Sequence, residues 1–393
     1  MDYEFDKGKF IEEQLEHAII QLFKDQDYTY VDGESIHRRY EDVLLIDDLE
    51  WYLHNRYADQ DLSDTEVAKI VNELQYISST PLYAGNRQAY WLINEGFDLV
   101  RDDASKPAVH IEFIDFDDPY ANEFKIVNQY SVQDVALRRP DLLVFVNGIP
   151  LVICEFKTAI EEDTTIHDAW EQITIRYNRD IPKLMKYCCM SVISDGANNR
   201  LGTIFTPYQH YYAWNKANDE DKVSNGISSL FTMIEGAFAK DRLIQILRDF
   251  IFYPDESSDN RALVCRYPQF FAATKMLDNI CRHLKPAGDG KGGTYFGATG
   301  CGKTYTMLFL SRLMIQRRAE ELCNPTIVII VDREDLDTQT SEDFVEAKRF
   351  LHEDDVRSIE SRNDLKETLG GKESGGVYIT TIQKFSEDIG LLS

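Results

Sequence analysis

The chain has 393 residues, of which 43% are hydrophobic and 12% aromatic, so it can bury the cores of two domains. It has no apolar run of about 18 residues and no signal-peptide core at its acidic start, which argues against a membrane protein. The formal net charge of −26 argues against a simple DNA-binding module, although a large enzyme can still carry a locally basic groove. Seven scattered cysteines, without a Cys-x-x-Cys pair, favour the reducing cytoplasm and argue against a zinc site.

The first part of the chain has a helical pattern that later changes to strands. Apolar residues such as Leu15, Ile19 and Phe23 recur at helical spacing. The predicted helices cover residues 8–25, 38–57, 64–79 and 83–96. From Ala108 onwards the pattern indicates strands, which we expect at residues 109–116 and 124–132.

The strongest local signal lies at residues 140–157. Two apolar runs, residues 142–146 and 151–156, flank the dipeptide Asn147-Gly148, which is typical of a tight β-hairpin turn. Asp141 opens the first strand, and Glu155 lies near the end of the second. A fold at the turn therefore brings Asp141 opposite the neighbourhood of Glu155.

Lys157 joins this group, because residues two apart in a strand face the same side and Lys157 follows Glu155 at that spacing. Buried charges cost free energy unless they pair or bind a metal. Two acids beside an ammonium group suit a hard cation that activates water for attack on a phosphodiester. A structural cluster of ion pairs is the alternative interpretation.

The next 100 residues continue the α/β pattern. We expect a helix at residues 165–179, short strands at 191–193 and 203–205, and a helical stretch at 227–251. Residues 254–260 are polar and rich in turn formers, which makes them the predicted domain boundary.

The last part of the chain alternates strands and helices. The predicted elements are helix 270–284, strand 294–296, helix 303–317, strand 326–331 and strand 377–380. The strand at 326–331 is almost continuously apolar, as a buried parallel strand should be. This alternation predicts a doubly wound parallel sheet.

Residues 297–304 fit the phosphate-loop pattern in its expected context, between a strand and a helix. Small residues allow the backbone N–H groups to surround the phosphates of ATP or GTP. Lys303 would reach the β- and γ-phosphates, and Thr304 would bind Mg²⁺. A chance glycine turn is the alternative. The candidate nucleotide-binding residues are Gly297, Thr299, Gly300, Cys301, Gly302, Lys303 and Thr304.

The motor expected from this loop is incomplete. Hydrolysis needs an acidic residue on a later strand to hold the Mg²⁺-bound water. No Asp-Glu pair follows an apolar strand after Lys303, and the sequence stops at Ser393. We therefore expect the chain to bind nucleotide but to hydrolyse it poorly alone.

Asp141 and Glu155-x-Lys157 together resemble the metal site of the PD-(D/E)xK nucleases. Longer stretches resemble the restriction and translocation (R) subunit of type I restriction enzymes over nearly the whole chain. These stretches lie at residues 124–132, 139–150, 169–182, 194–203, 266–269, 331–339 and 381–385. The last two resemble helicase motifs Ia and Ib, which would touch the DNA backbone.

The resemblance implies a role for each matching residue of the first domain. Asp141 and Glu155 would hold Mg²⁺, and Lys157 would polarise the attacking water or the scissile phosphate. A third carboxylate would come from the first helix, as Glu16 or alternatively Glu13. Solvated helix acids are the competing interpretation for both.

The same resemblance implies a supporting pair, Gln172 and Tyr177, and a glutamine that reads adenine, Gln269. The usual spacing of the pair is Gln-x-x-x-Tyr, whereas here Arg176 takes the expected place and Tyr177 comes one residue later. A helix-start role is the alternative for Gln269. Basic residues could contact phosphates or form a solvated face; these are Arg176, Arg179, Lys183 and Lys186.

The predicted fold class is α/β: a PD-(D/E)xK nuclease-like domain (residues 1–230), a helical linker (231–260) and the incomplete first RecA-like domain of a superfamily 2 motor (261–393). The implied function is Mg²⁺-dependent DNA cleavage with ATP-driven translocation. The implied partners are double-stranded DNA and the specificity and methylation subunits. Another nuclease–helicase fusion of repair or phage defence, or a non-catalytic nucleotide-binding scaffold, are the alternatives.

Overall fold

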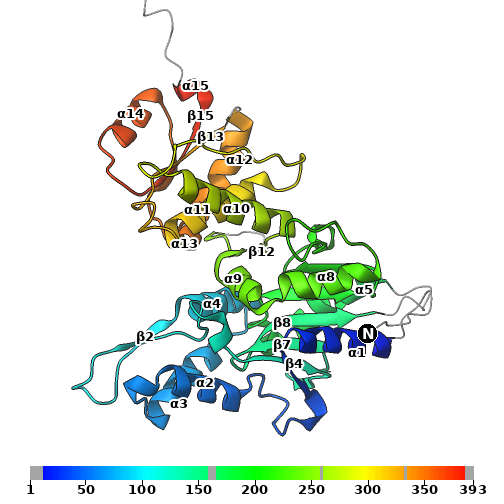
Figure 1. Cartoon of the computed structure of the whole chain (residues 1–393). Coiled ribbons are helices and arrows are strands. Elements are labelled where there is room, and N and C mark those ends of the chain that lie inside the picture. The colour runs from blue at the N-terminus through cyan, green and yellow to red at the C-terminus, as the bar shows by residue number, and fades with distance from the viewer. Residues whose placement is uncertain (1–11, 158–164, 257–259, 332–333, 386–393) are drawn as a thin grey trace, which may run out of the picture. The chain divides into compact units, whose positions relative to one another are not determined.

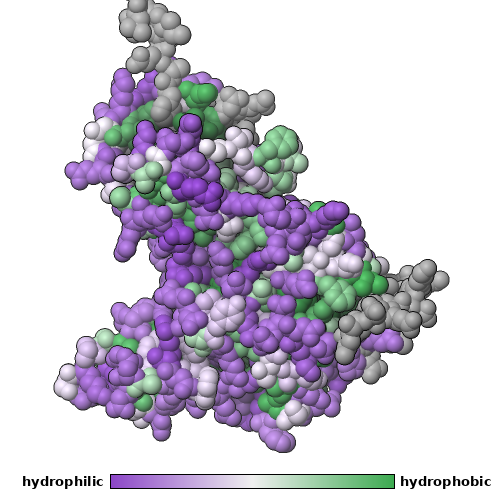
Figure 2. All heavy atoms as spheres, in the orientation of Figure 1, coloured by the Kyte–Doolittle hydropathy of each residue, from purple (hydrophilic) through white to green (hydrophobic). Residues whose placement is uncertain are grey.

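The computed structural model describes residues 12–157, 165–256, 260–331 and 334–385 (Figure 1). The chain divides into two compact units. Unit 1 comprises residues 1–251 and 262–264, and unit 2 comprises residues 252–261 and 265–393. In the part of the chain that is described, no helix is long and apolar enough to cross a membrane. Figure 2 shows hydrophilic residues over most of the face that it draws.

Unit 1 is a mixed α/β structure. Its helices are α1 (Glu12–Asp25), α2 (Ile46–Arg56), α3 (Asp64–Gln75), α4 (Leu82–Glu95), α5 (Ile166–Glu171), α6 (Asn178–Asp180), α7 (Pro182–Met185), α8 (Ile227–Ala237) and α9 (Lys240–Asp249). Its strands are β1 (Thr29–Asp32), β2 (Phe97–Leu99), β3 (Val109–Ile111), β4 (Phe124–Asn128), β5 (Val132–Gln133), β6 (Leu137–Arg138), β7 (Leu142–Val146), β8 (Ile149–Phe156), β9 (Met190–Ser194), β10 (Asn199–Gly202) and β12 (Leu263–Val264). Strand β11 (Ile251–Phe252) lies where the chain passes between the units.

The main sheet of the described residues has the strand order β1-β4-β7-β8-β9-β10. The pairs β1–β4 and β8–β9 are parallel, and the other neighbours are antiparallel. All residues of β7 and β8 are buried, which explains their continuous apolar sequences. Burying one such side chain contributes about 1.5–3 kcal/mol, so this hairpin is a main source of the core. Helices α1 and α5 both pack against β8 (Figure 1).

The predicted turn at Asn147-Gly148 joins β7 and β8. Both residues have positive φ angles, +50° and +78°, as the favoured two-residue hairpin turns require. A Cβ atom on Gly148 would lie 2.3 Å from the carbonyl oxygen of Leu45, so only glycine fits there. The amide of Leu45 in turn donates to the carbonyl of Gly148 (2.9 Å), which fixes the start of α2 against the turn.

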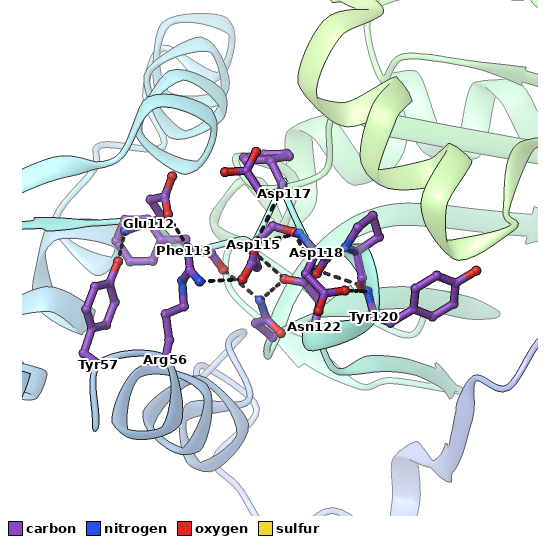
Figure 3. Close-up of polar contacts among 12 residues, drawn as sticks. Arg56, Tyr57, Glu112, Phe113, Asp115, Asp117, Asp118, Tyr120 and Asn122 are labelled. Carbon is purple, nitrogen blue, oxygen red and sulfur yellow. Dashed lines mark hydrogen bonds and ion pairs between the residues drawn. The ribbon is translucent and has the colours of Figure 1, made fainter. Parts of the chain in front are cut away.

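Asn147 also connects the turn to the loop after β3. Its buried side-chain amide donates to Phe113 O and to Asn122 Oδ1, and its Oδ1 accepts from Glu123 N. Asn122 donates to the Asp115 carbonyl, and Asp115 is paired with Arg56 of α2 at 2.6 Å (Figure 3). The loop is therefore held between the hairpin turn and α2.

Several predicted elements of unit 1 differ from the structure. The helix expected from residue 38 begins at Ile46, and the stretch 227–251 is two helices, α8 and α9. The strand at 109–116 ends at Ile111, because the Asp115 carboxylate accepts from the amides of the next turn. The strand expected at 203–205 lies at β10 instead, because hydroxyl bonds of Thr203 and Thr206 fold 203–206 into a turn.

Unit 2 contains a parallel sheet with the order β13-β15-β14 within the described residues. The strands are β13 (Ile327–Val331), β14 (Val356–Ser358) and β15 (Val377–Thr381). The helices are α10 (Tyr267–His283), α11 (Lys303–Gln316), α12 (Glu334–Val345), α13 (Lys348–Leu351), α14 (Arg362–Gly370) and α15 (Ile382–Phe385). The strand predicted at residues 294–296 is absent from the described structure. Residues 294–296 belong to none of the sheets of the described residues, and Phe296 is 93% exposed.

The role of Asn147 is testable by two substitutions. We expect Asn147→Ala to lower the free energy of unfolding by about 2–4 kcal/mol, because it loses buried hydrogen bonds and places a Cβ residue at positive φ without a compensating side chain. Asn147→Gly should retain the turn and lose only the hydrogen-bond contribution. Urea unfolding measures both, with exposed Asn55→Ala as the control. Equal stability of Asn147→Ala and Asn55→Ala would contradict the role.

Candidate functional site

The carboxylates of Asp141 and Glu155 come together at the open end of the β7–β8 hairpin. Leu142 pairs with Cys154, so Asp141 and Glu155 are the next two residues in register. The amide of Phe156 donates to Asp141 Oδ2 (2.7 Å), and Lys157 Nζ donates to Glu155 Oε1 (2.7 Å). Asp141 is 8% exposed and Glu155 only 1%. The convergence of two acids and a lysine is therefore present in the structure.

The helix expected at 165–179 is interrupted by a π-helical turn, η4 (Gln172–Tyr177), between α5 and α6. A π-helix hydrogen-bonds residues five apart, where an α-helix bonds residues four apart. The turn therefore absorbs the extra residue between Gln172 and Tyr177. Gln172 Nε2 donates to the Tyr177 hydroxyl (2.7 Å), and that hydroxyl donates to Glu155 Oε2 (3.0 Å).

Tyr177 lies at the position that faces the acids. Burial, and next the charge of Glu155, raise the pKa of its hydroxyl, so Tyr177 stays protonated and remains a donor. Because Gln172 donates to the hydroxyl oxygen, the single hydroxyl proton is directed to Glu155. Arg176, which takes the usual spacing in the sequence, is exposed. The one-residue shift thus leaves the tyrosine, and not the arginine, at Glu155.

Glu16 of α1 lies at the same end of the sheet but has partners of its own. Its two carboxylate oxygens accept from Asn128 Nδ2 (2.7 Å) and Gln129 Nε2 (2.9 Å). The amide of Gln129 donates to the carbonyl of Asp141, so this group borders the acid pair. No role was predicted for these two residues, although Asn128 ends the largely apolar strand β4 and Gln129 directly follows it. The side chain of the alternative, Glu13, lies outside the described residues.

The donor chemistry of this region suits Mg²⁺ with few protein ligands. Within residues 12–157, 165–256, 260–331 and 334–385, no group of three or more His, Cys, Asp or Glu side chains is arranged to hold one metal. Mg²⁺ commonly takes one or two carboxylates and completes its shell with water and substrate phosphate oxygens. Asp141 and Glu155 fit this pattern, while each carboxylate oxygen of Glu16 accepts a hydrogen bond from a side-chain amide, and its part in metal binding stays a prediction.

The phosphate loop of unit 2 leads directly into α11. Gly300 and Gly302 have φ angles of +79° and +80°, a conformation that glycine adopts without strain. Lys303 is the first residue of α11, and its Nζ donates to the carbonyls of Gly297 and Ala298 (both 2.9 Å). The lysine is thus folded back on the loop, at the N-terminus of a helix, where anions bind favourably.

Gln269 links α10 to this loop. Its Oε1 accepts from the Arg266 amide (2.8 Å), as in a helix N-terminal box, and its Nε2 donates to the Gly302 carbonyl (3.1 Å). Gln269 is buried, so the amide is engaged on both sides. This geometry accounts for a structural role of the glutamine at the helix start, and adenine recognition stays a prediction.

The remaining expected phosphate contacts divide into two groups. Lys186 is buried and donates to the carbonyls of Gln75, the last residue of α3, and of Ile77, which follows the helix. Burial lowers the pKa of Lys186 to about 8. This lysine therefore does not belong to an exposed basic face. Arg176 and Arg179 are exposed. Of the predicted motor contacts, residues 332–333 and the side chains of 334–339 lie outside the described part.

Known proteins resemble the chain over both units. The family model for the type I restriction enzyme R protein N terminus matches residues 9–210. The chain belongs to the type I restriction enzyme R protein family. A second family model, of the SWI2/SNF2 ATPases, matches residues 268–391 of this R-protein chain. The loop at 297–304 therefore lies in an ATPase-related segment.

Individual relatives agree with this family. A protein of Methanocaldococcus jannaschii that carries the name MjaIXP endonuclease subunit is 28% identical over 94% of the R-protein chain and 37% of its own length. The HindI endonuclease subunit of Haemophilus influenzae is 27% identical over 84% of this chain and 32% of its own length. The R-protein chain thus spans about a third of the length of these relatives.

The bridging geometry of Gln269 predicts a stability effect. Gln269→Ala should lower the free energy of unfolding of the nucleotide-free chain by about 1–3 kcal/mol, since it leaves buried partners unpaired. Thermal unfolding and ATP binding should be measured together. Lys303→Ala is the matched variant, expected to weaken ATP binding with little change in melting. If Gln269→Ala weakens only ATP binding, the bridging role is wrong.

Proposed function

We propose that unit 1 is a Mg²⁺-dependent DNA endonuclease of the PD-(D/E)xK type. The main support is the arrangement around Glu155. Lys157 donates to one of its carboxylate oxygens and Tyr177 donates to the other, while Asp141 lies opposite Glu155, one position beyond the Leu142–Cys154 pair. The position of Glu155 is thereby fixed before any substrate binds. Preorganised groups of this kind lower the cost of reaching a charged transition state.

Each residue has a distinct part in the proposed hydrolysis. Asp141 and Glu155 would hold Mg²⁺, which supplies a nucleophilic water and polarises a phosphate oxygen when bound. Lys157 would donate to the attacking water or to the phosphate as negative charge develops. Tyr177, oriented by Gln172, positions Glu155 and stays outside the bond changes. In the reaction a water O–P bond forms and a P–O ester bond breaks.

Unit 2 is proposed to be part of a RecA-like motor that binds ATP at residues 297–304. The phosphates would replace the carbonyls of Gly297 and Ala298 as partners of Lys303, and Thr304 would share in holding Mg²⁺. The proposed substrate is double-stranded DNA. The proposed partners are the specificity and methylation subunits of a type I restriction enzyme, by analogy with the relatives, which are named as endonuclease subunits.

Removing a metal ligand tests the nuclease. Asp141→Asn keeps the shape and removes the charge, so we expect at least about a hundredfold loss of Mg²⁺-dependent nicking of plasmid DNA. Lys157→Met should cause a comparable loss. Asp64→Asn, an exposed acid on α3, serves as the control and should retain activity. Undiminished nicking by Asp141→Asn would rule out the assignment.

The hydrogen bond from Tyr177 to Glu155 leads to a second prediction about the same site. Tyr177→Phe removes one hydrogen bond to a charged group, worth about 1.5–3 kcal/mol, so the cleavage rate should fall about tenfold to a hundredfold. It should also require more Mg²⁺ for half-maximal rate, because Glu155 is less well fixed. Asp64→Asn, the exposed acid on α3, is the control and should leave both quantities unchanged. A cleavage rate and Mg²⁺ requirement of Tyr177→Phe equal to those of the unaltered chain would refute the positioning role.

A further inference from the structure

Two arginines in unit 1 share one buried acid. Asp180 ends α6, and its side chain is 5% exposed. Its Oδ1 accepts from Arg179 Nε (2.6 Å), and its Oδ2 accepts from Arg179 Nη2 (3.0 Å) and from Arg138 Nε and Nη2 (2.8 and 2.6 Å). The two guanidinium groups, which repel each other, are thereby held side by side.

The arginines remain accessible although the acid is not. The Arg138 and Arg179 side chains are 39% and 65% exposed. A guanidinium carries five N–H donors, and Asp180 engages two nitrogens of each, so donors remain for a further oxyanion. The bond to Arg179, and next the bond to Arg138, hold the pKa of Asp180 at about 2, so the acid stays charged at neutral pH.

The backbone around the arginines is fixed from both sides. Strands β5 and β6 pair Val132 with Arg138. The hairpin that they form is bonded to the α6–α7 segment, because Ala136 N donates to the Asp180 carbonyl (3.1 Å) and Lys183 N to Asp134 Oδ2 (2.9 Å). The arginine pair is therefore presented by a rigid junction of two chain segments.

Both segments lead directly to the nuclease site. Arg138 precedes Asp141 by three residues, which is a span of at most about 11 Å. Arg179 follows Tyr177, the partner of Glu155, by two residues. Along the axis of a DNA duplex, about 11 Å corresponds to about three base steps.

We propose that Arg138 and Arg179, held by Asp180, form a clamp for the DNA backbone that binds phosphates within about three nucleotides of the cleaved bond. The inference rests on the proposed nuclease function for its purpose, and it names the substrate contact of that site. The clamp gives a strongly acidic chain a local positive surface at the place where the phosphodiester must approach.

Duplex binding without divalent metal tests the clamp, because DNA is then bound but not cut. The double variant Arg138→Gln with Arg179→Gln would leave Asp180 buried and unpaired and could unfold the chain. The variant to use is therefore Arg138→Gln, Arg179→Gln and Asp180→Asn together. The matched control, with the same net charge change, is Lys69→Gln, Lys106→Gln and Asp102→Asn, which alters exposed ion pairs elsewhere in unit 1.

Fluorescence anisotropy with a short labelled duplex, over about 50 to 200 mM NaCl, gives the affinity and its salt dependence. We expect the clamp variant to bind more weakly and the slope of log K against log salt to fall in size by about 1.8, for two lost phosphate contacts. The control variant should bind as the unaltered chain does. If the two variants match in affinity and slope, the clamp is overturned. This readout is independent of cleavage, so a failed nuclease assignment is seen separately with Asp141→Asn.

Discussion

The antiparallel register of β7 and β8 is the constraint on which the candidate site depends. Side chains alternate across a sheet, so a slip of one residue would turn Glu155 to the other face and separate it from Asp141. The register is fixed at the far end of the hairpin, where Asn147 and Gly148 adopt positive φ and bond to the loop at Phe113 and to Leu45. A register shift between Val144 and Phe145 moves the pairing by one residue, so the turn and this β-bulge together determine where the two acids meet.

Glu155 shows why the site needs partners from distant parts of the chain. A buried carboxylate is costly unless its oxygens are satisfied, and such groups contribute to specificity more than to stability. Lys157 satisfies one oxygen from the same strand, and Tyr177 satisfies the other from a helix packed on β8. The π-helical turn places Tyr177 where its hydroxyl reaches Glu155. Single π-helical turns inside helices occur frequently at functional sites.

The sequence predicts those features that local chemistry determines. Asn147-Gly148 between apolar runs specifies the hairpin, and this prediction is confirmed. The strand expected at 294–296 is absent from the described structure. A strand forms only where neighbouring strands are available to pair with it, and a short apolar pattern in the sequence does not show whether they are. Gln172 and Tyr177 illustrate the intermediate case. Their spacing departs from the family pattern, and only the three-dimensional path of the helix reveals that Tyr177 still reaches Glu155.

Three buried acids in unit 1 pair with arginines, and the exposure of these arginines differs from one acid to the next. Glu66 and Arg101 are both 3% exposed, so their pair is internal and ties α3 to the segment after β2. Arg56 joins the buried Asp115 to Glu112 and serves the loop at the hairpin turn (Figure 3). Only at Asp180 does a buried acid hold two arginines that both reach solvent. Arg138 and Arg179 both stabilise the charged form of Asp180, and each also leaves a part of its guanidinium exposed to solvent. Two exposed arginines held side by side form a local positive surface on a chain of net charge −26, which is what the proposed contact with the DNA backbone requires.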